Sequence, residues 1–155
     1  MAHIHEAIDF TVGAFLVHDG RVLLVHHRET GFWLSPGGHV ELDEDTDQAL
    51  WREIAEETGL QSGDIEMIGD PSPTFTGHDA AKSLHAPRWT NIHRINAHHR
   101  HIVLIYLFRA KTDRVSLSGE HHAIRWFSST ELDNPTLNTP VDTRWYAREA
   151  IRIAA

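Results

Sequence analysis

The sequence predicts a single domain, residues 1–155, with a mixed α/β fold. Four runs are rich in branched and aromatic residues, as strands are, and two other segments carry helix-forming residues at helical spacing. The expected strands are 10–18, 21–28, 101–110 and 123–127, and the expected helices are 46–58 and 141–154. A chain of 155 residues can bury a sizeable core in one domain.

The first half of the chain reads as a hairpin, a turn and a helix. Asp19-Gly20 separates the first two strands and has the residue types of a tight hairpin turn. A short extended piece over 32–35 then enters a turn at 36–38, Pro-Gly-Gly. The helix follows, and either Asp45 or Thr46 can serve as its N-cap.

The second half adds strands on either side of a long loop. We expect a short strand at 65–69 and then a loop, 70–89, whose length is typical of functional or mobile segments. Segment 101–110 is apolar on both faces, which indicates a strand in the interior of the sheet. A short helix is expected to begin within 128–132.

Three glutamates crowd one side of the first helix. At about 100° per residue, Glu53, Glu56 and Glu57 fall within an arc of roughly 100°. Like charges at this spacing destabilise a helix, and Arg52 offsets only part of the repulsion. Carboxylate oxygens suit Mg²⁺ or Mn²⁺, so the pattern indicates a metal site, although a solvated acidic face is the alternative for glutamates alone.

The wider pattern resembles the signature of the Nudix hydrolase superfamily. From Gly38 the spacing is five residues, Glu44, seven residues, and then REIAEETGL over 52–60, which matches each specified position. The resemblance implies the Nudix fold, a mixed sheet sandwiched between helices (α/β/α). It also implies a MutT-like enzyme that uses water and Mg²⁺ or Mn²⁺ to cleave a nucleoside diphosphate linked to another group.

The resemblance also implies roles for individual residues. Glu56 and Glu57 would bind metal, Glu53 would be a further ligand or the base that activates water, and a Gly37 carbonyl would complete the shell. Arg52 would orient the glutamates, so that the catalytic group is Glu53, Glu56 and Arg52.

Further candidates lie outside the signature. Glu120, which precedes a strand, is a candidate metal ligand with a solvated loop residue as the alternative. Candidates for substrate contact are Phe75 and Trp89, which could stack a base, Trp33 beside the glycine turn, and Arg28 as a phosphate contact; for the aromatic residues, packing is the alternative.

Composition excludes several classes of function. The net charge of −8 argues against binding to nucleic acid polymers, and the absence of cysteine excludes disulfides and thiol chemistry. No apolar run is long enough for a membrane span and no signal-peptide pattern opens the chain, so a cytoplasmic location is expected. The fourteen histidines form small groups, but none has a metal-site spacing along the chain.

Three hypotheses follow from these patterns. The leading one is a metal-dependent Nudix pyrophosphohydrolase with a nucleotide-type small-molecule substrate. Markers of several substrate subgroups are absent, which favours a nucleoside triphosphate or small nucleotide derivative. The alternatives are a Nudix domain that binds a nucleotide without cleaving it, and a histidine-rich metal-binding protein. A homodimer is a common assembly in the family.

Overall fold

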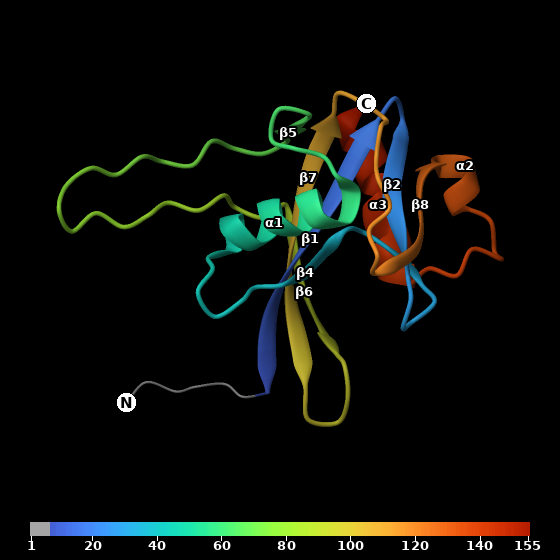
Figure 1. Cartoon of the computed structure of the whole chain (residues 1–155), viewed down its shortest axis with the longest axis horizontal. Helices are drawn as coiled ribbons and strands as arrows, with labels where there is room; N and C mark the ends of the chain where they lie inside the picture. The colour runs from blue at the N-terminus through green and yellow to red at the C-terminus, as the bar shows by residue number, and fades with distance from the viewer. Residues whose placement is uncertain (1–6) are drawn as a thin grey trace.

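The computed structural model describes residues 7–155 (Figure 1). Residues 1–6, which the predicted single domain and the predicted absence of a signal peptide include, lie outside the described residues. The strands are β1 (Ile8–His18), β2 (Arg21–His27), β3 (Trp33–Leu34), β4 (Gly37–His39), β5 (Ile65–Met67), β6 (Trp89–Arg94), β7 (Arg100–Ala110) and β8 (His121–Ser128). The helices are α1 (Thr46–Thr58), α2 (Ser129–Leu132) and α3 (Val141–Ala154). Each expected strand and helix is therefore present, with small shifts at its ends.

Two long strands, β1 and β7, form the centre of one mixed sheet. They run parallel from the pair Ile8–Arg100 to the pair Val17–Arg109, and the other pairings are antiparallel. The first half of β1 pairs with β4 and its last residues pair with β2. The first half of β7 pairs with β6 and its end pairs with β5. One end of the sheet is therefore ordered β4-β1-β7-β6.

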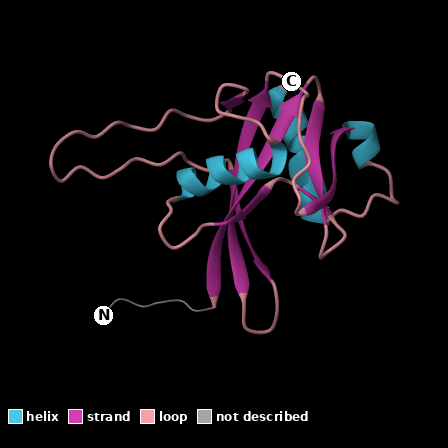
Figure 2. Cartoon of the chain, in the orientation of Figure 1, coloured by secondary structure: helices cyan, strands magenta, loops and turns pink. Residues whose placement is uncertain are grey.

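Helices cover both faces of this sheet, as the predicted α/β/α sandwich requires (Figures 1 and 2). Because side chains alternate along a strand, β1 directs Ala14 and Leu16 toward α1 and directs Phe15 and Val17 toward α3. The α1 layer buries Leu50 and Ile54, whereas the α3 layer buries small residues, Ala147, Ala150 and Ala154. The apolar character of the central strands on both faces follows from these two cores.

Local turn chemistry agrees with the sequence prediction. Asp19 and Gly20 both have positive φ, 44° and 72°, as a tight hairpin turn requires. Asp45 is the N-cap of α1: its side chain accepts from the backbone N–H of Gln48, and the Gln48 side chain accepts from the Asp45 N–H. Gly59 ends the helix in the left-handed conformation.

Two strands were not predicted, β4 and β6. Strand β4 is Gly-Gly-His, whose glycines have low strand propensity, and it forms because Gly37–His39 pairs with residues 11–13 of β1. Strand β6 is largely exposed and polar, and it forms by pairing along the edge of β7. Both strands depend on long-range pairing, which the local sequence pattern does not record.

The long loop that was expected over 70–89 spans residues 68–88, and it is an arm that reaches away from the sheet (Figure 2). Polar contacts join it to the start of α1: Lys82 pairs with Asp45, and His85 Nδ1 lies 2.9 Å from Asp47 Oδ2. Among residues 7–155, none of the helices combines the length and apolarity that a membrane crossing requires.

Candidate functional site

The site is built around the contact between β4 and α1. The Gly37 N–H donates to Glu57 Oε2 over 2.8 Å. A Cβ on Gly38 would lie 2.2 Å from Glu53 Oε1, and a Cβ on Gly37 would lie 2.1 Å from the Val12 carbonyl oxygen. Gly37 therefore has no room for a side chain against the β1 backbone, whereas a side chain at Gly38 would displace the Glu53 carboxylate.

The three helix glutamates differ in burial. Glu53 and Glu57 are only 9% and 4% exposed, since they face β4, whereas the Glu56 side chain is 61% exposed. Among the described residues, the oxygens of these three carboxylates do not all lie within 4.8 Å of one another. Two carboxylates thus line the inner side of the β4–α1 contact, and the third lies at its rim.

Arg52 connects this acidic group. Its guanidinium donates twice to Glu44, at 2.6 and 2.8 Å, and also to Glu53 at 2.8 Å and Glu56 at 3.2 Å. A further N–H donates to the His39 carbonyl over 3.0 Å. Arg52 therefore fixes the loop before α1, β4 and two helix carboxylates in one arrangement, as its planar fork of donors allows.

The negative charge of the site exceeds what Arg52 compensates. Burial raises the pKa of Glu53, Arg52 lowers it, and the neighbouring Glu57 and Glu56 raise it again. Hydrogen bonds to Glu44, Glu53 and Glu56 raise the pKa of Arg52 further, although burial opposes them. A hard divalent cation fits this site by donor type and by charge, because four carboxylates share one guanidinium.

A buried histidine supports Glu57 from the opposite side. His121 Nε2 lies 2.6 Å from Glu57 Oε1, and both side chains are at most 5% exposed. Among the described residues, His121 Nδ1 is the buried side-chain nitrogen or oxygen that lacks a hydrogen-bond partner. His121 was not among the predicted site residues, since one residue of a histidine pair carries no signal of contact with a glutamate 64 positions earlier.

A cleft of about 280 Å³ lies beside β4 on the α3 side of the sheet. Its walls include Gly37, Gly38 and His39 of β4, with residues of β1, β6, β7 and the start of α3. Burial lowers the pKa of His101 in this wall, and the neighbouring histidines act in the same direction. Strand β4 thus borders the buried carboxylates and the cleft at once.

The three aromatic candidates lie at different places in the fold. Trp33 stacks on His26 and packs edge-on against Phe127, in a separate depression. Phe75 is exposed on the arm, where it borders arm residues, and Trp89 packs against Tyr146. The structure thus shows packing contacts for Trp33 and Trp89 and an exposed Phe75, and a substrate contact by any of the three stays a prediction.

The remaining candidates are exposed. Arg28 follows β2 at the surface. Glu120 lies in a turn, where its N–H donates to Ser118 Oγ over 3.3 Å, and the next residue is the buried His121. The turn of Glu120 is therefore adjacent to the carboxylates, although its own side chain points to solvent-accessible space.

The protein thus has a glycine strand packed against a glutamate-bearing helix in an α/β/α sandwich. The NUDIX domain family description matches residues 8–148. The chain therefore belongs to the Nudix family.

Individual relatives agree with this assignment. The CTP pyrophosphohydrolase of Escherichia coli is 31% identical over 99 residues, which cover 61% of this chain and 72% of that protein. A MutT-like protein of Streptomyces ambofaciens is 39% identical over 65 residues, but the match spans 42% of each protein. The crystal structure of a NUDIX-family hydrolase from Clostridium perfringens superposes with a TM-score of 0.80 at 26% identity, over 95% of this chain and 98% of that one.

Proposed function

We propose that this protein is a metal-dependent pyrophosphohydrolase that cleaves a nucleoside diphosphate linked to another group. The observation that carries the proposal is the contact of Glu53 and Glu57 with the glycine strand that also forms a cleft wall. The names of relatives support the substrate class, since one is a CTP pyrophosphohydrolase and another, from Bacillus subtilis, is a putative 8-oxo-dGTP diphosphatase. A nucleoside triphosphate or a small nucleotide derivative is the proposed substrate.

Mg²⁺ or Mn²⁺ is the proposed cofactor, and Glu53, Glu56 and Glu57 are its proposed ligands. The Gly37 carbonyl and Glu120 are the proposed additional ligands, because both lie on segments that contact Glu57 or its partner His121. When bound, such an ion would neutralise negative charge on the phosphate oxygens and lower the pKa of a bound water molecule.

The side chains themselves supply positioning. Arg52 holds Glu53 and Glu56 in place and ties them to β4, which limits the freedom of these carboxylates before substrate enters. Glu53 and Glu56 are the proposed groups for accepting the proton of the attacking water. In the overall reaction one water adds across a phosphoric anhydride: an oxygen–phosphorus bond forms, another breaks, and the leaving phosphate takes up charge.

The test is product analysis after incubation with Mg²⁺ or Mn²⁺ and a substrate panel. The panel contains nucleoside triphosphates, oxidised nucleoside triphosphates, ADP-ribose, dinucleoside polyphosphates and nucleotide sugars. Glu57→Gln should abolish cleavage with the fold retained, and Glu66→Gln, an exposed glutamate of β5, is the matched control. Full activity of Glu57→Gln, or full turnover in excess chelator, would contradict the proposal. Nucleotide binding without any cleavage by the unaltered protein would favour the non-hydrolysing module.

A further inference from the structure

A cluster of histidines and one aspartate lies on one face of the sheet, apart from the carboxylates of α1. Asp9 of β1 pairs directly with His101 of β7, and His101 pairs directly with His93 of β6. His39 of β4 pairs with Thr11, two residues after Asp9. Cross-strand partners project to the same face, so four neighbouring strands each contribute one of these side chains to a single region.

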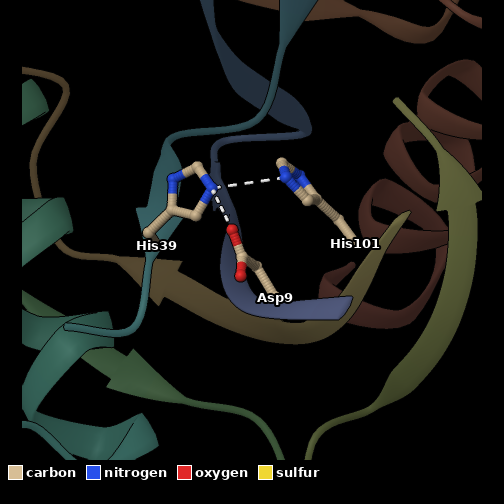
Figure 3. Close-up of side chains that lie close together, drawn as sticks. All are labelled: Asp9, His39 and His101. Atoms are coloured by element: carbon tan, nitrogen blue, oxygen red, sulfur yellow. Dashed lines mark hydrogen bonds and ion pairs between the residues drawn. The ribbon is translucent and has the colours of Figure 1, made fainter. Parts of the chain in front are cut away.

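Three of these side chains bring their ligand atoms together (Figure 3). His39 Nε2 lies 3.3 Å from His101 Nε2 and 3.5 Å from Asp9 Oδ2. Within residues 7–155, Asp9, His39 and His101 form the one group of His, Cys, Asp or Glu residues whose ligand atoms all lie within 4.8 Å of one another. The convergence is therefore specific to this place in the fold.

Two of the three separations are close to those within a metal shell. Ligand atoms at about 2.0–2.1 Å from a tetrahedral Zn²⁺ lie roughly 3.3 Å apart, which the two measured separations approach. Direct contacts, a hydrogen bond between the imidazoles and an ion pair of His39 with Asp9, place both neighbours on the same His39 nitrogen, as a shared ion would also require. Two imidazoles and one carboxylate suit Zn²⁺, Co²⁺ or Ni²⁺ better than Mg²⁺.

A neighbouring histidine orients the carboxylate. His99 Nε2 lies 3.1 Å from the same Asp9 oxygen, and its ring packs edge-on against His101 at 5.1 Å between centroids. Such outer contacts commonly fix the ligands of protein metal sites. His39 and Asp9 have side chains 57% and 48% exposed, so an ion can reach the group from solvent.

We propose that Asp9, His39 and His101 bind one transition-metal ion of the zinc class. Three protein ligands leave a fourth position for water or an anionic oxygen. His39 and His101 also line the cleft beside β4, so a ligand in the cleft can reach that fourth position. This site is separate from the α1 carboxylates and does not depend on the proposed hydrolase activity.

The experiment is a titration of the tag-free, full-length protein with Zn²⁺ by calorimetry, in excess Mg²⁺ so that carboxylate sites hold the hard ion. Co²⁺ absorption then reports the coordination geometry. We expect saturable uptake of one ion per chain, lost in His39→Ala and in His101→Ala and retained in His98→Ala, an exposed histidine of the β6–β7 turn. Circular dichroism checks that each variant is folded, and the exposed His39 provides the variant least expected to disturb the core.

Two outcomes would overturn the proposal. One is Zn²⁺ uptake that is unchanged in both His39→Ala and His101→Ala, or absent from the unaltered protein. The other is uptake that persists in these variants but is lost in Glu57→Gln, because the ion would then bind at the carboxylates of α1. Retention of Zn²⁺ binding in Glu57→Gln, together with loss of hydrolysis, would show that the two sites are independent.

Discussion

Substitution of Gly38 by alanine tests the role of the β4–α1 contact directly. The new Cβ would lie 2.2 Å from Glu53 Oε1 and 2.6 Å from its Cδ, whereas ordinary contact begins at 3.4 Å. The carboxylate must therefore withdraw by about 1 Å, since the obstructing atoms belong to the end of a flexible side chain and the β4 backbone is held by β1.

The expected loss is mainly in rate. A displacement of about 1 Å at a reacting group can lower turnover about a hundredfold, or about 2.7 kcal/mol of activation free energy. The free energy of unfolding should fall by only about 0.5–1.5 kcal/mol, the cost of an off-rotamer side chain. The measurements are kcat/KM with the substrate that the panel identifies, Mn²⁺ affinity by calorimetry, and urea unfolding.

Two other glycines provide matched controls. A Cβ on Gly37 would lie 2.1 Å from the Val12 carbonyl oxygen at a φ of 150°, so Gly37→Ala should chiefly destabilise the fold. Gly63→Ala introduces a Cβ with no neighbour within 4 Å and should change neither property. If Gly38→Ala is folded and retains unaltered kcat/KM and Mn²⁺ affinity, the argument that Gly38 positions Glu53 is wrong.

Three further predictions concern the groups around this contact. His121→Phe should lower the free energy of unfolding by about 1–3 kcal/mol and weaken Mn²⁺ binding, because buried Glu57 loses its partner. His121→Gln should restore part of the stability and part of the Mn²⁺ affinity. Equal stability and equal affinity in the unaltered protein and both variants would refute the supporting role of His121. Arg52→Lys should lower the free energy of unfolding, measured in urea, by about 1.5–3 kcal/mol, since an ammonium cannot reproduce the paired hydrogen bonds to Glu44. An unchanged free energy of unfolding would contradict the role of Arg52 in holding the loop before α1. A hydrogen bond from Lys82, to which backbone donors and the Lys82 charge add, holds the pKa of Asp45 below its usual 3.8. The contribution of the Asp45 carboxylate to stability is therefore present above pH 3.8 and is lost as the pH falls through the lowered pKa. The Tm difference between the unaltered protein and Asp45→Asn should therefore shrink in acid, and a difference that is constant with pH would exclude the charge effect.

The fold was predictable wherever local pattern and core burial agree. The two central strands were found because branched residues occupy both faces, and both cores use this alternation. Helix α1 was predicted with its bounds, since Asp45 and Gly59 give local start and stop signals. Strands β4 and β6 were missed because long-range pairing creates them from glycine or polar residues.

The site was predictable only in part, for a related physical reason. Glu53, Glu56 and Glu57 lie on one side of a helix, so helical spacing alone indicates an acidic group, but not that Glu53 and Glu57 are buried while Glu56 is exposed. The contact of His121 with Glu57 depends on how β8 lies relative to α1, and spacing along the chain contains no such information. The same holds for the cluster of Asp9 and three histidines, whose members come from four strands and were individually indistinguishable from surface residues.

Strand β4 connects the carboxylates, the cleft and the histidine cluster within three residues. The Gly37 N–H holds Glu57, Gly38 leaves room for Glu53, and the His39 carbonyl accepts from Arg52 while its ring meets His101. Because adjacent residues of a strand project to opposite faces, one short strand can present its backbone to α1 and a side chain to the cleft. A substitution at His39 that shifts the β4 backbone would therefore also move the carbonyl to which Arg52 donates. The effect of a His39 substitution on hydrolysis must for this reason be compared with that of His101→Ala, which removes a cluster ligand from β7 and leaves β4 unaltered.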